Sequence, residues 1–488
     1  MTLSLALNNA LSGINVTSRQ ADAISDNVAN ALSEGFGRRD VQITSANAGG
    51  TGIGARVAGI DRAANPALTE SRRLAEAELG RRDTISEGLA RIAAQIGEPG
   101  DPQSLTSLAD TLDAALAQAV DSPESPSLLN NVALSAGDYA NQINRVAIEI
   151  NTVRTETDAS ITQQVSVLNR NLGEIEALND EIRSRNLAGL DTSALQDERQ
   201  RLIDKVSSLI PIRVAKRDGG EVALFGRNGG QLLDGRAFEV EFTGTSVVTA
   251  DRSLAAGNLS GLSIEGRPID IGLGGDRGLL DGGSLSAAFE LRDRILPDII
   301  DQVDGLAADL VTRVQDLPQD PTLAPGDPGL FTDAGVAFDP ANTLGLGSRI
   351  ALNAAVDPLV GGDPTLLRDG LNATTVGEVG NASVLSGIQE ALREQRAAPA
   401  GTGITGVQGV ADLAADLGGL LLAEAANAEE DRLQQQGRTD ALFDSERAVT
   451  GVDTDRELSR LLLIEQTFQA NARVIEVVDS LLARLVQI

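Results

Sequence analysis

The residues that could carry out acid–base chemistry in this chain are almost all carboxylates. The sequence contains 70 Asp and Glu, no His and no Cys. It therefore offers no imidazole base, no thiolate nucleophile, no disulfide and no zinc site built from His and Cys. Paired carboxylates can hydrolyse a glycosidic bond. A peptidoglycan-cleaving glycosidase is thus one open alternative, although nothing in the sequence singles out a pair.

Two Gly-rich stretches match ligand-binding patterns by their letters. Residues 401–406, GTGITG, fit a dinucleotide-binding loop, but such loops follow a buried strand. The preceding EALREQRAAPA is typical of a charged helix that ends at Pro399. Residues 272–283, GLGGDRGLLDGG, resemble a calcium-binding repeat, but they occur once and such repeats must stack. We therefore predict no cofactor and no metal site.

The composition indicates a large folded protein with an acidic surface. The 488 residues, 42% of them hydrophobic, suffice for two to four domains. A formal net charge of −30 opposes binding to nucleic acid or anionic lipid. No basic residue precedes Arg19 and no apolar run could span a bilayer, so neither a cleaved signal peptide nor a membrane helix is expected. A cytoplasmic helical scaffold is a second alternative.

Both ends of the chain carry a heptad pattern. Near the N-terminus, apolar or small residues recur at alternating steps of four and three, at Leu3, Leu7, Ala10, Ile14, Thr17, Ala21, Ile24, Val28 and Ala31. Near the C-terminus the same spacing runs through Leu461, Ile464, Phe468, Asn471, Ile475, Val478, Leu482 and Leu485. The second run is about 37 Å of helix, close to the length of the first.

These two seams could form one antiparallel coiled coil. The small residues Ala10, Thr17 and Ala21 would accept large side chains from the other helix, and Asn471 would fix the register at a cost in stability. The alternative is that each helix packs separately on its own bundle.

The middle of the chain changes period twice. DVQITS and IGARVAGI alternate like two strands of a hairpin, and a helical pattern follows from about 65 to 210. The period becomes two between about 213 and 283, helix returns at 284, and residues 317–370 are irregular before the last helices. We predict an α+β fold, with a terminal coiled coil (1–34 and 453–488), a helical bundle (35–212 and 284–452) and an inserted β-rich domain (213–283).

Two terminal motifs resemble those of the bacterial flagellar axial proteins, the family of rod, hook and hook-associated proteins. The N-terminal stretch LSGINVTSRQADAISDNVANALSEGFGRRD places six residues where the family pattern has them, namely Ser12, Gly13, Ser25, Asn27, Ala29 and Asn30. The C-terminal stretch matches most specifically at residues 469–473, QANAR. Two departures are that Phe36 replaces the usual Tyr, and that Ala31–Gly35 replaces the usual N-T-P-G.

The middle segments GIDRAANPALTESRR, SALQDERQRLIDKVSSLIPIRV and GGSLSAAFELRDRIL resemble the members found at the hook–filament junction. The resemblance implies a non-enzymatic structural adaptor of the flagellum, outside the cell, exported through the flagellar type III channel without a cleaved signal. It implies four partners: copies of itself in a tube, the hook protein, a second, filament-side hook-associated protein, and a cytoplasmic export chaperone on the C-terminal helix.

Assembly contacts are expected on the paired ends. The predicted residues are Leu3, Leu7, Ile14, Ile24, Asn27, Val28, Asn30, Leu461, Ile464, Phe468, Asn471, Ile475, Val478, Leu482 and Leu485.

Overall fold

The computed structural model describes residues 3–33, 35–48, 51–272, 278 and 280–486. The chain divides into two compact units. Unit 1 comprises residues 1–78, 168–239 and 435–488, and unit 2 comprises residues 79–167 and 240–434. Helices α2 (Pro66–Ile96), α4 (Pro126–Leu187) and α10 (Val410–Thr450) contribute residues to both units. No described helix is long and apolar enough to cross a membrane.

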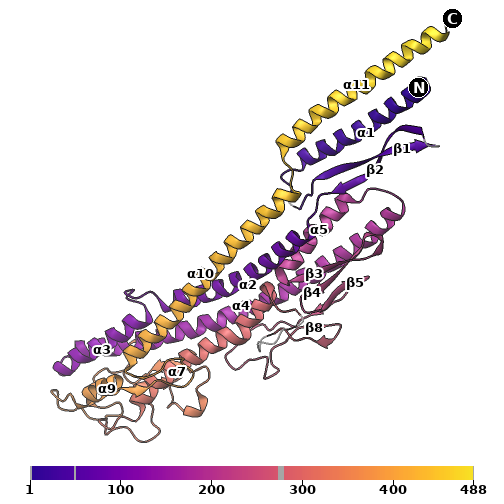
Figure 1. Ribbon diagram of the computed structural model, residues 1–488. Coiled ribbons are helices and arrows are strands. Elements are labelled where there is room, and N and C mark those ends of the chain that lie inside the picture. Colours follow the sequence, from indigo (N-terminus) through magenta and orange to yellow (C-terminus); the bar gives the residue numbers. More distant parts are fainter. Residues whose placement is uncertain (1–2, 34, 49–50, 273–277, 279, 487–488) are drawn as a thin grey trace. The chain divides into compact units, whose positions relative to one another are not determined.

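Unit 1 contains both ends of the chain. Its other complete helices and strands are α1 (Leu3–Ala29), β1 (Arg39–Ala48), β2 (Thr51–Arg62), α5 (Ser193–Leu209), β3 (Ile212–Lys216), β4 (Val222–Gly226), β5 (Gln231–Asp234), β6 (Arg236–Ala237) and α11 (Thr454–Val486). Helices α1 and α11 lie side by side with the two termini at the same end, and the β1–β2 hairpin lies along α1 (Figure 1). Strands β3 to β6 form one antiparallel sheet in sequence order.

Unit 2 is built from helices around one large core. Its helices are α3 (Leu105–Asp121), α6 (Gly283–Glu290), a π-turn (Leu291–Ile295), α7 (Leu296–Gln315), α8 (Leu366–Asp369) and α9 (Ser383–Arg393). Its strands are β7 (Val240–Glu241), β8 (Ser263–Ile264), β9 (Arg267–Pro268), β10 (Phe331–Asp333), β11 (Ile350–Leu352), β12 (Arg396–Ala397) and β13 (Val407–Gln408). Buried apolar side chains such as Leu116, Leu306 and Leu417 form its core.

The predicted α+β class is confirmed, because long helices combine with small antiparallel sheets in the middle of the chain. The structure adds details that the sequence did not give. Helix α1 ends at Ala29, so Ala31 lies beyond the helix that carries the rest of its seam. The segment 213–283 holds two separate sheets, of which β3–β6 belongs to unit 1 and β7–β9 to unit 2.

The structure describes all of one Gly-rich stretch, residues 401–406, but only part of the other, residues 272–283. Residues 401–406 lie in the connection between β12 and β13, which pair antiparallel, and Thr402 is buried with its hydroxyl donating to Pro399 O over 2.8 Å. This is hairpin geometry, which differs from a strand that feeds a phosphate-binding helix. Half of residues 272–283, namely 273–277 and 279, lies outside the described part of the chain.

Candidate functional site, the paired terminal helices

Helix α1 buries two faces at once. One face packs along α11 and the other against the β1–β2 hairpin. The hairpin contact is fixed by Ser12, whose Oγ accepts a hydrogen bond from the backbone N–H of Ala55 over 3.1 Å. The side chains of Val16 and Ala23, which are not in the predicted seam, are also buried. The heptad pattern therefore identified one of two packed faces.

The face of α1 toward α11 contains a close approach at Gly13. A Cβ atom on Gly13 would lie 2.6 Å from Nδ2 and 2.8 Å from Oδ1 of Asn471, shorter than real non-bonded contacts. A glycine at this position lets the Asn471 side chain lie directly on the backbone of α1. Two family-motif residues, one from each end of the chain, thus contact each other.

A second contact joins the other ends of the two helices. The side chain of Asn27 is fully buried, and its Nδ2 donates to Glu457 Oε2 over 3.2 Å. Gly13 and Asn27 are 14 residues apart in α1, and Glu457 and Asn471 are 14 apart in α11. Both contacts therefore obey one antiparallel register, as expected when two heptad seams pair.

Asn27 also fixes α1 to strand β1. Its Nδ2 donates to Arg39 O over 3.0 Å, and its Oδ1 accepts from Arg39 N over 2.8 Å. The buried amide donates to both α11 and β1 and accepts from β1, which a shorter or apolar residue could not reproduce.

Charged groups continue this contact on α11. Arg460 Nη1 lies 2.9 Å from Asp40 Oδ1 and 3.3 Å from Glu457 Oε1. Burial alone would raise the pKa of Asp40, but the hydrogen bonds and charges of Arg460 and Arg38 outweigh it and hold the pKa below its usual value. The Glu457 carboxylate is 1% exposed, so its ion pair with Arg460 offsets part of the cost of burial.

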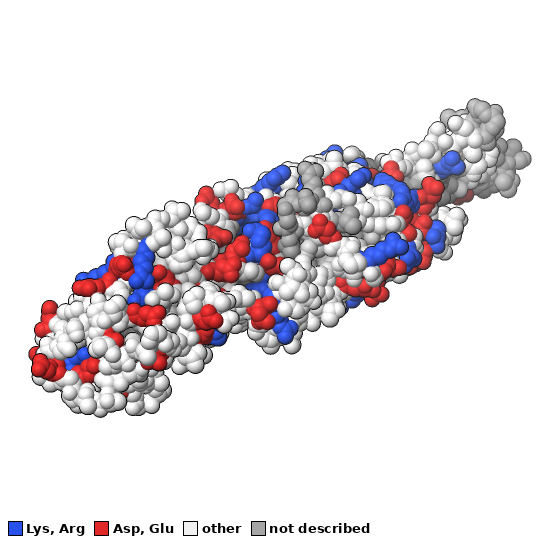
Figure 2. All heavy atoms as spheres, turned by 90° about the horizontal axis from the view of Figure 1, so that it is seen from below, with Lys and Arg blue, Asp and Glu red and all other residues white. Residues whose placement is uncertain are grey.

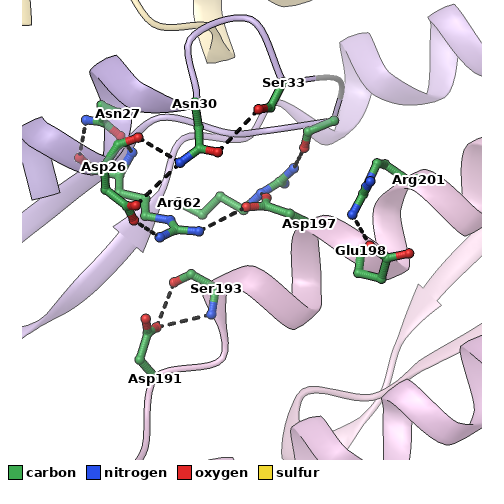
Figure 3. Close-up of polar contacts among 12 residues, drawn as sticks. Asp26, Asn27, Asn30, Ser33, Arg62, Asp191, Ser193, Asp197, Glu198 and Arg201 are labelled. Carbon is green, nitrogen blue, oxygen red and sulfur yellow. Dashed lines mark hydrogen bonds and ion pairs between the residues drawn. The ribbon is translucent and has the colours of Figure 1, made fainter.

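The β1–β2 hairpin is tied to helix α5 through Asp197 (Figure 3). Arg39 and Arg62 are directly opposite each other in the hairpin, an arrangement that is destabilising when uncompensated. Asp197 lies between them: its Oδ2 is 3.3 Å from Arg39 Nη2, and its Oδ1 accepts from Arg62 Nε. In the turn after α1, Asn30 donates to Asp26 O over 3.0 Å.

The outer face of α11 is apolar and uncovered. Six side chains away from the seam are between 42% and 62% exposed, namely Leu458, Leu462, Leu463, Val474, Val477 and Leu481. The described atoms of this end of the chain carry few charges in the view of Figure 2. A helix that is apolar on both faces is normally buried on both, so these side chains form a candidate contact surface.

The predicted assembly residues fall into three groups. Ile24, Asn27 and Val478 are buried. A second group is partly exposed and lies on the helices or in the following turn: Leu3, Leu7, Ile14, Val28, Asn30, Leu461, Ile464, Asn471 and Ile475. Phe468 and Leu482 lie in the seam but are 43% and 40% exposed. Leu485 is in α11, and its side chain is outside the described part.

Sequence reasoning missed the polar contacts and the outer face. Extending the seam of α11 one step upstream from Leu461 leads to Glu457, so that residue could have been found. The run LLLI at 461–464 is apolar around the whole helix and signals two buried faces. Asp197 had no such signal, because its partner Arg62 is 135 residues away from it in the sequence.

The alternative as a glycosidase needs a cleft carboxylate of raised pKa. Burial raises the pKa of Asp304 to about 6, although hydrogen bonds from the backbone N–H groups of Gly347 and Gly345 lower it. These bonds are 2.7 Å and 2.5 Å long, and Asp304 is 2% exposed in the core of unit 2. Its raised pKa follows from a structural position and does not indicate a catalytic acid. Among the described residues, no cluster of three or more acidic side chains could hold a metal ion.

Known families match both the middle and the end of the chain. The family model of the helical domain of flagellar hook-associated protein FlgK matches residues 89–330. The model of the C-terminal region of flagellar basal-body rod FlgEFG proteins matches residues 449–488. Flagellar hook-associated protein 1 of Bacillus subtilis (strain 168) is 22% identical over 99% of this chain and 97% of its own length. The chain belongs to the flagellar hook-associated protein family.

Other relatives match over shorter spans. Flagellar hook-associated protein 1 of Salmonella typhimurium is 25% identical over 48% of this chain, and the match covers 43% of that protein. A solved structure of the flagellar hook junction protein FlgK from Burkholderia pseudomallei has a TM-score of 0.43 and 19% identity, covering 55% of this chain and 47% of that one. Family membership confirms the recognition made from the terminal motifs, and it makes this chain a structural hook–filament junction adaptor of the flagellum.

Proposed function

We propose that the chain joins hook to filament by assembling with copies of itself through the paired helices α1 and α11. The observation that carries this proposal is the uncovered apolar face of α11. Burying a large apolar side chain contributes about 1.5–3 kcal/mol. Six half-exposed side chains could therefore contribute on the order of 5 kcal/mol or more per subunit when neighbours cover them.

The three predicted segments then have separate roles, although segment 213–283 is divided between the two units and is not one compact domain. Residues 1–34 and 453–488 line the inner tube, residues 35–212 and 284–452 form the next shell, and residues 213–283 face outward. The fifteen predicted assembly residues supply the inner contacts. The partners are copies of the chain, the hook protein on one side and the second hook-associated protein on the other.

The route to this position is export without a cleaved signal, through the flagellar type III channel. An apolar helix face that waits for its partners is an aggregation hazard. We therefore expect a cytoplasmic export chaperone to cover α11 before export. A chain that ends before Leu458 should not be captured by this chaperone in a pull-down, whereas a chain lacking residues 213–283 should be captured. The reverse pattern would contradict the assignment.

Electron microscopy of a deletion strain tests the central proposal. Loss of the gene should leave hooks without filaments, and the wild-type copy should restore filaments. Normal filaments in the deletion strain would refute a junction role. The role requires no catalytic residue, because the work is done by packing.

A further inference from the structure

Unit 1 contains a large hollow that the terminal helices do not use. It measures about 900 Å³ and lies among strand β2, the first turns of α2, the start of α5 and strand β3. Five cationic side chains line it, namely Arg19, Arg62, Arg73, Arg199 and Lys216, against three acidic ones, Asp61, Glu70 and Asp191. Arg62 and Arg73 are already paired with Asp197 and Asp204. Arg19, Arg199 and Lys216 are therefore the lining cations that a further partner could reach.

Two of the arginines are buried, and neither is fully paired with carboxylates. Arg199 is 8% exposed, and its Nη1 donates to the neutral oxygens Asn179 Oδ1 and Gly220 O over 2.7 Å and 2.8 Å. Burial, aided by the charge of Arg62, lowers the pKa of Arg199 to about 10, as expected for a buried cation that lacks a close carboxylate. Arg73 is 6% exposed, and its buried Nη2 has no hydrogen-bond partner in the described part of the chain.

The rim of the hollow is apolar. Leu190, in the loop between α4 and α5, is 58% exposed, and Val214 of β3 is 38% exposed. Both line the hollow. A floor of cations with an apolar rim fits a protein segment that carries both carboxylates and an apolar side chain.

The end of α10 within unit 1 presents such a segment. Gln435 and Thr439 face inward, because both donate to Ala75 O, over 2.9 Å and 3.2 Å. Asp440 and Asp444 are exposed, and no ion pair to either occurs among the described residues. Phe443, beside them, is 45% exposed. We call Asp440, Phe443 and Asp444 the acidic ridge.

The acidic ridge lies outside the hollow, since no residue of α10 lines it. Two unlike, complementary patches at separate places on one subunit are what a head-to-tail contact between identical copies needs. Copies that each carry a charge of −30 repel one another, so a contact between them requires a locally cationic surface.

We infer that the hollow lined by Arg199 and Lys216 receives the acidic ridge of a neighbouring copy in the tube. This contact rests on the proposed self-assembly and adds to it a lateral interface outside the terminal helices. The carboxylates of Asp440 and Asp444 approach the cationic floor, and Phe443 packs on the rim at Leu190 and Val214.

Cysteine crosslinking in assembled flagella tests the contact, because the natural chain has no Cys that could react. The double variant Lys216→Cys/Asp440→Cys is expressed in the deletion strain, flagella are isolated, and a short bis-maleimide is added. A denaturing gel should show a ladder of dimers, trimers and higher species. The matched control is Arg213→Cys/Asp440→Cys, because Arg213 is on the opposite face of β3 from Ile212, Val214 and Lys216, which line the hollow.

The outcomes separate this inference from the proposed function. A ladder for the Lys216 pair, with at least tenfold less product for the Arg213 pair, supports the contact. Equal products, dimers alone, or no product although the variant is present in flagella would overturn it. Absence of the wild-type chain from isolated flagella would overturn the proposed function as well. As a second measurement, Lys216→Glu should reduce incorporation several-fold and Lys216→Glu/Asp440→Lys should restore it, whereas failure of the restoration would count against the pairing.

Discussion

Gly13 of α1 lies directly against the side chain of Asn471 of α11, at a distance that leaves no room for a Cβ atom. The contact explains why a glycine and an asparagine recur in two motifs at opposite ends of the chain. The glycine admits the amide, and the amide fixes where along α1 the other helix rests. Together with the hydrogen bond between Asn27 and Glu457, it sets the antiparallel register of the pair.

The first prediction concerns this contact. Gly13→Ala gains about 1 kcal/mol of helix propensity, but the added methyl group must displace the Asn471 amide, at a cost of about 1–3 kcal/mol. We expect a net loss of pairing, seen as less of the chain in purified hook–basal bodies. Gly13→Ala/Asn471→Ala should recover part of the loss. If Gly13→Ala assembles better than the wild type, the gain in helix propensity outweighs the loss of the contact with Asn471.

The second prediction concerns the seam of α11. Ile475→Asp places a carboxylate at a half-buried position of the helix pair, which costs several kcal/mol in a dry interface. Filaments should be lost while the melting of unit 2 is unchanged, because Ile475 belongs to unit 1. Gln434→Asp, at an exposed position of α10 in unit 2, is the control and should assemble. Filaments of normal number with Ile475→Asp would exclude this residue from the seam.

The third prediction concerns the Asp197 bridge. Asp197→Asn removes the carboxylate between Arg39 and Arg62 and leaves Asp26 as a counter-charge for Arg39 alone. Breaking a buried pair costs about 3–5 kcal/mol. Hydrogen exchange of the β1–β2 amides should accelerate by roughly 100-fold, the equivalent of about 3 kcal/mol. Glu198→Gln is the matched control, since Glu198 forms an exposed pair with Arg201 worth about 0–1 kcal/mol. Similar rates of hydrogen exchange in both variants would show that Asp197 does not anchor the β1–β2 hairpin.

A structural feature can be predicted from the sequence when the residues that produce it lie close together in the chain. The heptad spacing from Leu461 to Leu482 requires only one helix, and the helix that carries it packs along α1. Gly13 was recognised as part of a motif, but its contact depends on a register that neither helix contains alone. The anchoring of the hairpin by Asp197 arises only when α5 folds against β1 and β2. The run LLLI at 461–464 indicates the outer face of α11, because the seam accounts for only Leu461 and Ile464 of these four apolar residues.

The fourth prediction concerns pH and Asp304. Its pKa is raised from 3.8 to about 6 in the folded chain, first by burial. A raised folded-state pKa means that stability is fully present below the unfolded pKa and is lost as pH rises through the folded pKa. Between about pH 4 and pH 6, the wild type should therefore lose about 3 kcal/mol relative to Asp304→Asn.

Asp304→Asn also changes the free energy of unfolding by an amount that does not depend on pH. The amide can accept only one of the hydrogen bonds from Gly345 and Gly347 through its oxygen. The measurement is the difference in free energy of unfolding of unit 2 between wild type and variant, from urea titrations at several pH values. Thr111→Ala, at an exposed site on α3, removes no titratable group, so it is the control and should give a flat difference. A flat difference for Asp304→Asn would show that the carboxyl does not titrate in this range.

The last prediction concerns the chain before assembly. The pair of α1 and α11 has small residues in one seam and Asn471 in the other, and its outer face is uncovered, while ordering each residue costs about 1–2 kcal/mol. We expect both helices to be largely unfolded in the isolated monomer and helical in the tube or on a chaperone. Limited proteolysis should remove residues after about Thr450 and most of the first 33 residues, and leave a stable core.

The hairpin decides how far this trimming extends. Because Asp197 ties Arg39 and Arg62 to α5, residues 39–62 should survive in the wild type, whereas in Asp197→Asn trimming should continue to about Arg62. Mass spectrometry of the core locates both ends. A monomer that resists cleavage in α1 and α11, with protected amides in both helices, would mean that the pair is stable within one chain. Its outer face would then serve contact with neighbours without being needed for folding, and assembly would not be coupled to the formation of the helices.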